Sequence, residues 1–138
     1  MPPIAPAFET ATRCGIDTVE IARIERLLAQ NAGDELLRWF SPTEIADSGR
    51  GAGRTASLAA RFAAKEACVK LFPRETALGE IEPVDFSVAR DAYGAPQVVL
   101  SSRAEAVLTR NGIRAIALSL AHDRTSACAI ALALPATP

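Results

Sequence analysis

The sequence has few cysteines, and no two of them form a Cys-x-x-Cys pair. Cys14, Cys68 and Cys128 are odd in number and widely separated, which argues against a disulfide framework and against a structural zinc site. We expect reduced thiols that are mostly buried. The N-terminus also lacks the basic start and the unbroken apolar core of a signal peptide. These absences predict a cytoplasmic protein.

Long hydrophobic runs without charge are missing too. The most apolar region, residues 113–134, carries His122, Asp123 and Arg124 at its middle. This excludes a membrane span and predicts two strands joined by a polar turn. The net charge is −1 and the pI is near 5.8, so the overall charge favours neither nucleic acid nor a membrane as a partner. Any basic surface must be local.

The composition is that of a folded protein, with 49% hydrophobic and 22% charged residues in a chain of 138. This length suffices for one domain with its own core. We expect a loose Pro- and Ala-rich lead-in over residues 1–13, a domain over 14–134 and a short tail over 135–138. The elements follow one another as a strand, helices, a hairpin, a helix and a hairpin. This order predicts a single α+β domain whose antiparallel sheet is covered by helices.

Residues 55–72 form the stretch around which we expect the chain to be organised. Ala, Leu, Lys, Glu and Arg dominate there, and neither Gly nor Pro interrupts the run. The stretch predicts one helix that Thr55 or Ser57 caps and Pro73 ends. Its apolar residues recur at helical spacing and form a stripe to be buried: Leu58, Phe62, Val69 and Phe72.

Shorter elements surround this helix. A buried strand is expected to end at Asp17, where a helix begins that runs through Gln30, because Asp17 and Glu20 resemble a capping box. Residues 34–40 and the capping-box sequence that starts at Ser41 predict two short helices. Residues 48–54 are a flexible basic loop, for which a solvated connector is the simplest interpretation.

The second half of the chain predicts two hairpins and a helix. Residues 85–90 and 97–100 alternate around turn residues. Residues 101–111 predict a helix that Ser102 caps and Gly112 ends. Residues 113–121 and 127–134 form the closing hairpin.

Three polar groups lie beside apolar sequence: Asp17, Glu66 with Lys70, and His122. Two carboxylates brought together would bind a hard cation such as Mg²⁺, which prefers a site completed by waters and phosphates. Lys70, one helical turn from Glu66, could neutralise phosphate oxygens, although such a pair also decorates solvated helices. His122 stands where a strand ends and either bonds a phosphate or has a structural role. The residues suggest a metal-assisted phosphate site without identifying the reaction.

Several blocks of the sequence carry a resemblance to a known family. Residues 15–24 contain Gly-x-Asp followed six residues later by Arg-Ile, and residues 61–70 read Arg-Phe-Ala-Ala-Lys-Glu-Ala-Cys-Val-Lys. Gly-x-Pro at 94–96 and Ser-Leu-Ala-His at 119–122 follow in order. The chain resembles the holo-acyl-carrier-protein synthases, the small type of 4′-phosphopantetheinyl transferase, over roughly residues 14–133.

The resemblance implies an enzyme of lipid metabolism such as fatty acid biosynthesis. It would use Mg²⁺ to transfer 4′-phosphopantetheine from coenzyme A to a serine of an apo acyl carrier protein, releasing 3′,5′-ADP. Asp17 and Glu66 would hold the metal, and the base for the serine hydroxyl would be Glu66 or a metal-bound water. Lys70 would stabilise transition-state charge, and His122 would take part in catalysis close to the coenzyme.

The resemblance also implies binding roles. Lys70, His122 and Arg61 would contact coenzyme A, and Arg23 would dock the acidic recognition helix of the carrier protein. The family assembles as a trimer with sites between neighbouring subunits, and the apolar closing strands are compatible with a homotrimer.

Two departures from the family pattern are expected to affect the affinity for coenzyme A more than the fold. Residues 73–76 replace a Gly-rich loop whose backbone approaches the phosphates, so Arg74 would substitute a side chain for it, or the loop is rebuilt. Ala121 precedes His122 where a hydroxyl residue is usual. The alternatives are therefore a catalytically weak module that binds coenzyme A or a carrier protein, and a metal hydrolase that cleaves coenzyme A without an acceptor.

Overall fold

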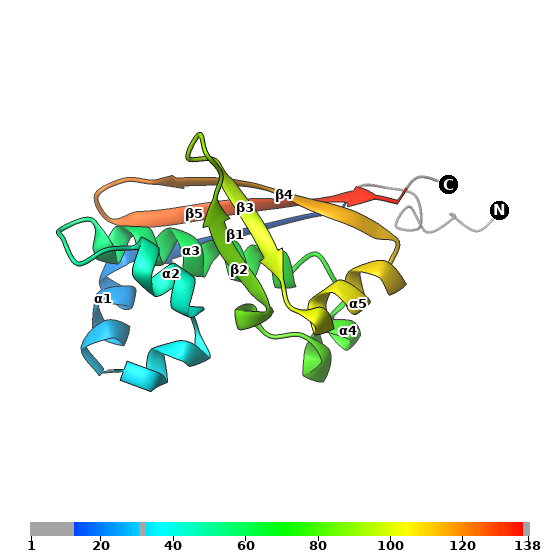
Figure 1. Cartoon of the computed structure of the whole chain (residues 1–138), viewed down its shortest axis with the longest axis horizontal. Coiled ribbons are helices and arrows are strands. Elements are labelled where there is room, and N and C mark those ends of the chain that lie inside the picture. Colours follow the sequence, from blue (N-terminus) through cyan, green and yellow to red (C-terminus); the bar gives the residue numbers. More distant parts are fainter. Residues whose placement is uncertain (1–12, 31–32, 137–138) are drawn as a thin grey trace, which may run out of the picture.

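The computed structural model describes residues 13–30 and 33–136. It contains a three-stranded and a two-stranded antiparallel sheet, both packed against one long helix (Figure 1). The strands are β1 (Arg13–Glu20), β2 (Phe86–Arg90), β3 (Pro96–Leu100), β4 (Ile113–His122) and β5 (Ser126–Pro135). The α-helices are α1 (Ile21–Gln30), α2 (Pro42–Asp47), α3 (Arg54–Val69), α4 (Arg74–Glu80) and α5 (Ser102–Arg110). Two 3-10 helices are η1 (Gly33–Arg38) and η2 (Pro83–Asp85). The α+β fold class is confirmed.

The larger sheet has the order β1-β5-β4, so the first strand pairs with the last one. The ladder between β1 and β5 runs from the pair Arg13 and Ala133 to the pair Glu20 and Ser126. The long β4–β5 hairpin spans the molecule above α3, while the β2–β3 hairpin crosses in front of it (Figure 1). Both hairpins that the sequence predicts are confirmed.

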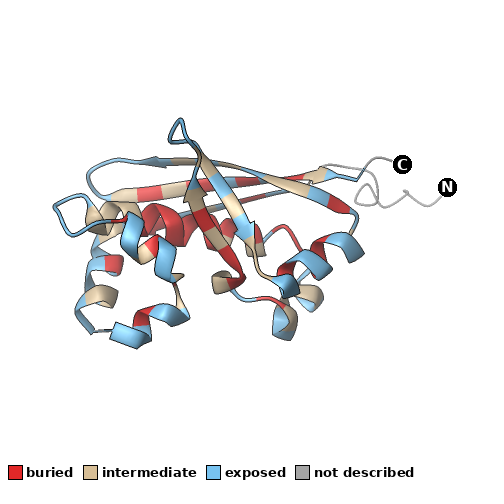
Figure 2. Ribbon diagram, in the orientation of Figure 1, coloured by how far each residue is buried: buried red, intermediate tan, exposed pale blue. Residues whose placement is uncertain are grey.

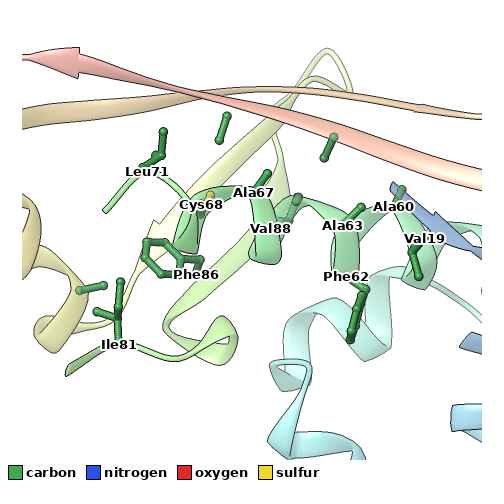
Figure 3. Packing of buried hydrophobic residues seen from close by; sticks show 14 of the residues in the cluster. Val19, Ala60, Phe62, Ala63, Ala67, Cys68, Leu71, Ile81, Phe86 and Val88 are labelled. Carbon is green, nitrogen blue, oxygen red and sulfur yellow. The ribbon is translucent and has the colours of Figure 1, made fainter. Parts of the chain in front are cut away.

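The core lies between α3 and the inner face of the larger sheet. Alanines form much of this contact, and small side chains on both elements allow the helix to approach the strands closely. Figure 2 shows the buried positions gathered along α3 and the strands above it, and Figure 3 shows their packing. The buried alanines are Ala59, Ala60, Ala63, Ala64 and Ala67 on α3 and Ala127, Ala129, Ala131 and Ala133 on β5.

The first strand extends further than expected and contains Asp17. The helix predicted from Asp17 begins at Ile21, and the predicted capping box of Asp17 with Glu20 is wrong. All eight residues of β1 pair with β5. The continuous ladder with β5 therefore outweighs the local capping signal, as tertiary context does with many propensities.

The central helix has different ends from those predicted. It ends at Val69 rather than at Phe72, because the chain turns there and buries the side chains of Leu71 and Phe72 in the core. At the other end the N-cap is Gly53, without a side-chain hydrogen bond. Capping by Thr55 or Ser57 is therefore wrong.

Pro73 starts a helix instead of ending one. It is the N-cap of α4, so the segment that replaces the expected Gly-rich loop is helical. This helix is kinked at Leu78 and at Gly79, whose φ of +82° lies in the region that glycine tolerates.

The shorter helices form where the sequence predicts them, and one of the two predicted capping residues is displaced by one position. The capping box of α2 is confirmed, because Ser41 Oγ accepts from Glu44 N–H at 3.2 Å and Glu44 Oε1 accepts from Ser41 N–H at 2.9 Å. The cap of α5 is Ser101 rather than Ser102. The helix expected over residues 34–40 is the 3-10 helix η1.

The thiols are unpaired as expected, but only Cys68 is buried. Cys14 is exposed and Cys128 is half-buried, since both belong to the larger sheet rather than to the core helix. The expectation of mostly buried thiols is therefore wrong.

Residues 1–12 of the expected lead-in and 137–138 of the tail lie outside the described residues. No helix in the described part of the chain is long and apolar enough to cross a membrane.

Candidate active site

A glycine brings β1 against the end of α3. A Cβ atom built on Gly15 would lie 2.1 Å from the backbone oxygen of Ala67 and 3.2 Å from Cβ of Lys70. The two backbones therefore touch with no side chain between them, which only glycine permits. The next residue, Ile16, accepts a hydrogen bond from Lys70 Nζ through its carbonyl oxygen at 2.9 Å.

This contact places Asp17 beside Lys70. Lys70 Nζ lies 2.9 Å from Asp17 Oδ1 in an ion pair whose aspartate is largely covered while the lysine is half-exposed. An ion pair so open to water contributes little stability. The ion pair matters for where it places the two groups. The ammonium group of Lys70 stays accessible to a ligand, and the carboxylate of Asp17 beside it can also bind a second cation.

Glu66 completes a charged cluster with Asp17, Lys70 and Arg23. It is half-buried, and burial followed by the charge of Asp17 raises the pKa of its carboxyl group, while Lys70 and Arg23 act in the opposite direction. The structure thus brings together two carboxylates from the beginning and the middle of the chain. We call these four residues the carboxylate cluster.

The donor set of the carboxylate cluster fits a hard divalent cation. Two carboxylates close enough to raise a pKa gain from a cation between them. No group of three or more His, Cys, Asp or Glu side chains in the described residues could hold a metal alone. Asp17 and Glu66 would therefore supply two ligands and leave the other positions to water or substrate, the arrangement that suits Mg²⁺.

Arg23 has a defined place at the rim of this cluster. It is exposed on α1, and its guanidinium lies 5.4 Å from the centre of the Phe62 ring. The contact with the ring orients the side chain without covering its charge. A negatively charged partner can therefore reach it.

His122 lies in a separate pocket of about 570 Å³ between α3, the β2–β3 hairpin and β4. In the sheet register it faces Ala127, which faces Val19 of β1, so it is two strands away from β1, about 10 Å. Within one chain His122 is thus not part of the carboxylate cluster. The pocket is lined by Gly53, Ala56, Ser57, Ala60, Arg90, Gly94, Pro96, Leu118, Ser119, Leu120, Ala121 and His122.

Arg61 lies behind this pocket rather than on its surface. Its side chain is buried, and Nη1 donates to the hydroxyl oxygen of Ser57, a pocket residue. Nε has no hydrogen-bond partner within the described ranges. Burial and then the charge of Arg90 lower the pKa of Arg61. Two guanidinium groups that repel each other beside one pocket favour an anionic ligand there.

Arg74 is the exposed first residue of α4, four positions after Lys70. Sequence reasoning gave no ligand-binding role to Ser57 and Arg90, which line the pocket. It also missed an ion pair between Glu44 and Lys65 that is completely buried. Lys65 belongs to the sequence motif of residues 61–70 on α3, so it could be singled out from the sequence. That Glu44 and Arg90 lie next to α3 is known only from the fold.

Comparisons with known proteins identify the family of the chain. The family model of the 4′-phosphopantetheinyl transferase superfamily matches residues 13–131. A holo-acyl-carrier-protein synthase of Moorella thermoacetica is 39% identical over 118 residues, which cover 86% of this chain and 90% of the relative. One of Treponema denticola is 40% identical over 119 residues, covering 86% and 94% of the two chains.

Solved structures show the same fold. A complex of the Chronobacterium ammoniagenes synthase with coenzyme A has a TM-score of 0.76 at 29% identity, covering 92% of this chain and 99% of the other. The Helicobacter pylori holo-acyl-carrier-protein synthase in complex with coenzyme A has a TM-score of 0.72 at 28% identity, covering 88% and 99%. The chain therefore belongs to the 4′-phosphopantetheinyl transferase superfamily and, within it, to the holo-acyl-carrier-protein synthases.

Proposed function

We propose that this protein uses Mg²⁺ to transfer the 4′-phosphopantetheine group of coenzyme A to a serine hydroxyl of an apo acyl carrier protein. The serine oxygen forms a bond to the β-phosphorus of coenzyme A, the bond from this phosphorus to the bridging oxygen breaks, and 3′,5′-ADP leaves. The observation that carries the proposal is the meeting of Asp17, Glu66 and Lys70 at the contact of β1 with α3.

Three residues of the carboxylate cluster have a role in this step. Asp17 and Glu66 would hold Mg²⁺, which supplies positive charge to the diphosphate when bound. Lys70, held by Ile16 and Asp17 with half of its side chain exposed, adds positive charge to the leaving phosphate oxygens. Its fixed position matters because phosphoryl-type transfer depends mainly on positioning and electrostatics. The base for the serine proton would be Glu66 or a water held by the metal.

The pocket beside His122 is proposed to bind the phosphorylated nucleoside part of coenzyme A. Support comes from His122 and Arg90 at its wall, and from Arg61 behind Ser57. All three favour an anion, and the coenzyme carries phosphates on that part. Arg74 is proposed to contact the same molecule near Lys70, from the start of α4.

Arg23 is proposed to dock the carrier protein. It is exposed at the rim of the carboxylate cluster, so an acidic helix bound there would bring its serine close to Glu66. Attraction of this kind raises the association rate and selects partners by charge.

A homotrimer is proposed because the outer face of the larger sheet is apolar and is not covered by the described residues of the single chain. Ile16 of β1 pairs with Ile130 of β5, and Leu132 lies two residues further on β5, with 63%, 43% and 39% of these residues exposed. Adjacent exposed apolar side chains mark association surfaces. In such an assembly His122 of one subunit would complete the site at the carboxylate cluster of a neighbour.

The three unpaired thiols suit a cytoplasmic location.

The test is to incubate the protein with coenzyme A, Mg²⁺ and an apo carrier protein, and to measure the intact mass of the carrier. We expect a gain of one phosphopantetheine group, which chelation of the metal abolishes. Binding of coenzyme A without any mass gain on several carriers would favour the alternative of a weakly catalytic binding module. That alternative is motivated by α4, which replaces the loop after Lys70, and by Ala121 in the pocket.

A further inference from the structure

Two oppositely charged side chains form an ion pair that has no contact with water. Glu44 of α2 and Lys65 of α3 are both 0% exposed. Glu44 Oε1 also accepts from Ser41 N–H at 2.9 Å, and Lys65 Nζ lies 6.0 Å from the centre of the Phe40 ring. Removing such a pair from water costs about as much free energy as its attraction returns. Stability alone therefore does not account for it.

The remaining bonds of the pair go to one edge of β2. Glu44 Oε2 accepts from Val88 N–H at 2.9 Å, and Lys65 Nζ donates to the carbonyl oxygen of Phe86 at 2.8 Å. Alternate residues of a strand direct their backbone groups to opposite edges, and among the described strands β2 pairs with β3 alone. The two side chains thus bond the groups that a neighbouring strand would otherwise bond.

The register of the hairpin agrees with this arrangement. Arg90 faces Pro96, which has no N–H to donate, so this pair belongs to the positions that do not bond across the hairpin. Phe86 and Val88 lie four and two residues before Arg90, so their backbone N–H and C=O groups point to the same outer edge of β2 as those of Arg90. A second link from α2 joins the Ser41 and Ser87 hydroxyl oxygens at 2.7 Å.

The hairpin and α3 together build the pocket of His122. The hairpin contributes Arg90, Gly94 and Pro96, and α3 contributes Ser57 and Ala60. A shift of β2 relative to α3 would move these walls against each other. The bonds from Glu44 and Lys65 oppose such a shift, because they join α2 and α3 to the free edge of β2.

We propose that Glu44 and Lys65 are positioning residues that hold the β2–β3 hairpin in register with α3 and thereby shape the coenzyme A pocket. This inference rests on the proposed function, which assigns coenzyme A to the pocket.

Two variants separate positioning from stability. Combining Glu44→Met with Lys65→Met removes both bonds to β2 and leaves no single charge buried. Glu44→Gln keeps one oxygen for Val88 N–H and leaves Lys65 to bond Phe86. It gives up the oxygen that accepts from Ser41 N–H and leaves the charge of Lys65 unpaired, so it controls for loss of the ion pair while both bonds to β2 remain. Val107→Ala in α5 removes core volume without removing a bond of Glu44 or Lys65, and it controls for lost stability.

The measurements are hydrogen exchange at the Val88 amide and kinetics with coenzyme A and carrier protein varied separately. In the double variant we expect rapid exchange at Val88 and a rise of about tenfold in KM for coenzyme A, because small misplacements in a binding site are costly. The KM for the carrier and the Mg²⁺ concentration for half-maximal rate should not change. Glu44→Gln should stay within about twofold of the wild-type KM, because it retains both bonds.

Three results would overturn the proposal. One is an unchanged KM for coenzyme A in a folded double variant, and another is an equal rise in Val107→Ala. If the double variant does not fold, hydrogen exchange in the wild-type protein decides. Exchange of the Val88 amide as fast as that of an exposed amide at a strand edge would overturn the proposal. A wild-type protein that neither binds coenzyme A nor modifies a carrier would refute the proposed function itself, whatever Val88 does.

Discussion

Replacing Gly15 with alanine tests whether the contact between β1 and α3 builds the site. The added methyl group would lie 2.1 Å from the backbone oxygen of Ala67, whereas real Cβ atoms essentially never come closer than 3.0 Å. Since the obstacle is backbone, the strand and the helix must separate by the difference, about 1 Å or more. The same movement pulls Asp17 and Ile16 away from Lys70.

The magnitude follows from two opposing effects. Alanine in a strand interior is favoured over glycine by about 0.5–1 kcal/mol when it fits. Forcing a methyl group into a packed contact costs about 1–3 kcal/mol. We therefore expect a net loss of stability, with about 4 °C in Tm for each kcal/mol in a domain of this size. Displacement of the carboxylate cluster should lower kcat/KM by about 100-fold, more than the stability loss alone explains.

Thermal unfolding by circular dichroism and transfer kinetics below the transition measure the two effects. Gly51→Ala is the matched control, because a Cβ atom at Gly51 meets nothing within 4 Å. It should leave Tm and rate unchanged. Wild-type Tm and wild-type rate in Gly15→Ala would refute the view that this backbone contact positions the cluster.

The remaining predictions concern charge and thiols. Asp17→Asn and Glu66→Gln should abolish transfer without unfolding the protein, and a normal rate in either would remove that residue from the metal site. Because burial and then Asp17 raise the pKa of Glu66, the stability from its neutral form is complete below its ordinary pKa of 4.5 and is lost as pH rises through the raised value. Glu66→Gln should retain that stability, and a Tm profile against pH as steep as the wild-type profile would contradict this. Arg23→Ala should raise KM for the carrier more than KM for coenzyme A, and equal increases would argue against docking. Burial raises the pKa of Cys68 to about 12, so an alkylating reagent should modify Cys14 before Cys68 in the dissociated chain, as peptide mass spectrometry can show. Because Cys14 pairs with Leu132 on the face proposed for the trimer, assembly should slow its alkylation.

The sequence was sufficient where neighbouring residues decide the structure. The capping box of α2 depends on Ser41 and Glu44, three residues apart, and it forms as predicted. The hairpin turn with Gly94 forms as well, since φ there is +83°. The signature helix is present because its propensity and its apolar stripe agree. For the same reason Glu66 and Lys70 share one face, as their spacing requires.

Local signals failed where distant segments compete for the same residues. Asp17 has the neighbours of a helix cap, but β5 pairs with it and makes it part of a strand. For Arg61 the resemblance implies contact with coenzyme A, and only packing shows that its side chain is buried behind Ser57. The bonds from Glu44 and Lys65 to the edge of β2 have no signal in the sequence.

The sequence by itself determined the family and the kinds of element, and it predicted which residues would bind a cation and phosphates. These follow from composition, spacing and motif order, which are properties of short stretches. Only the tertiary structure decided that Asp17 and Glu66 meet, that His122 lies two strands away from β1, and which charges are buried. Those facts depend on backbone contacts between segments distant in sequence, above all the one that Gly15 allows with Ala67.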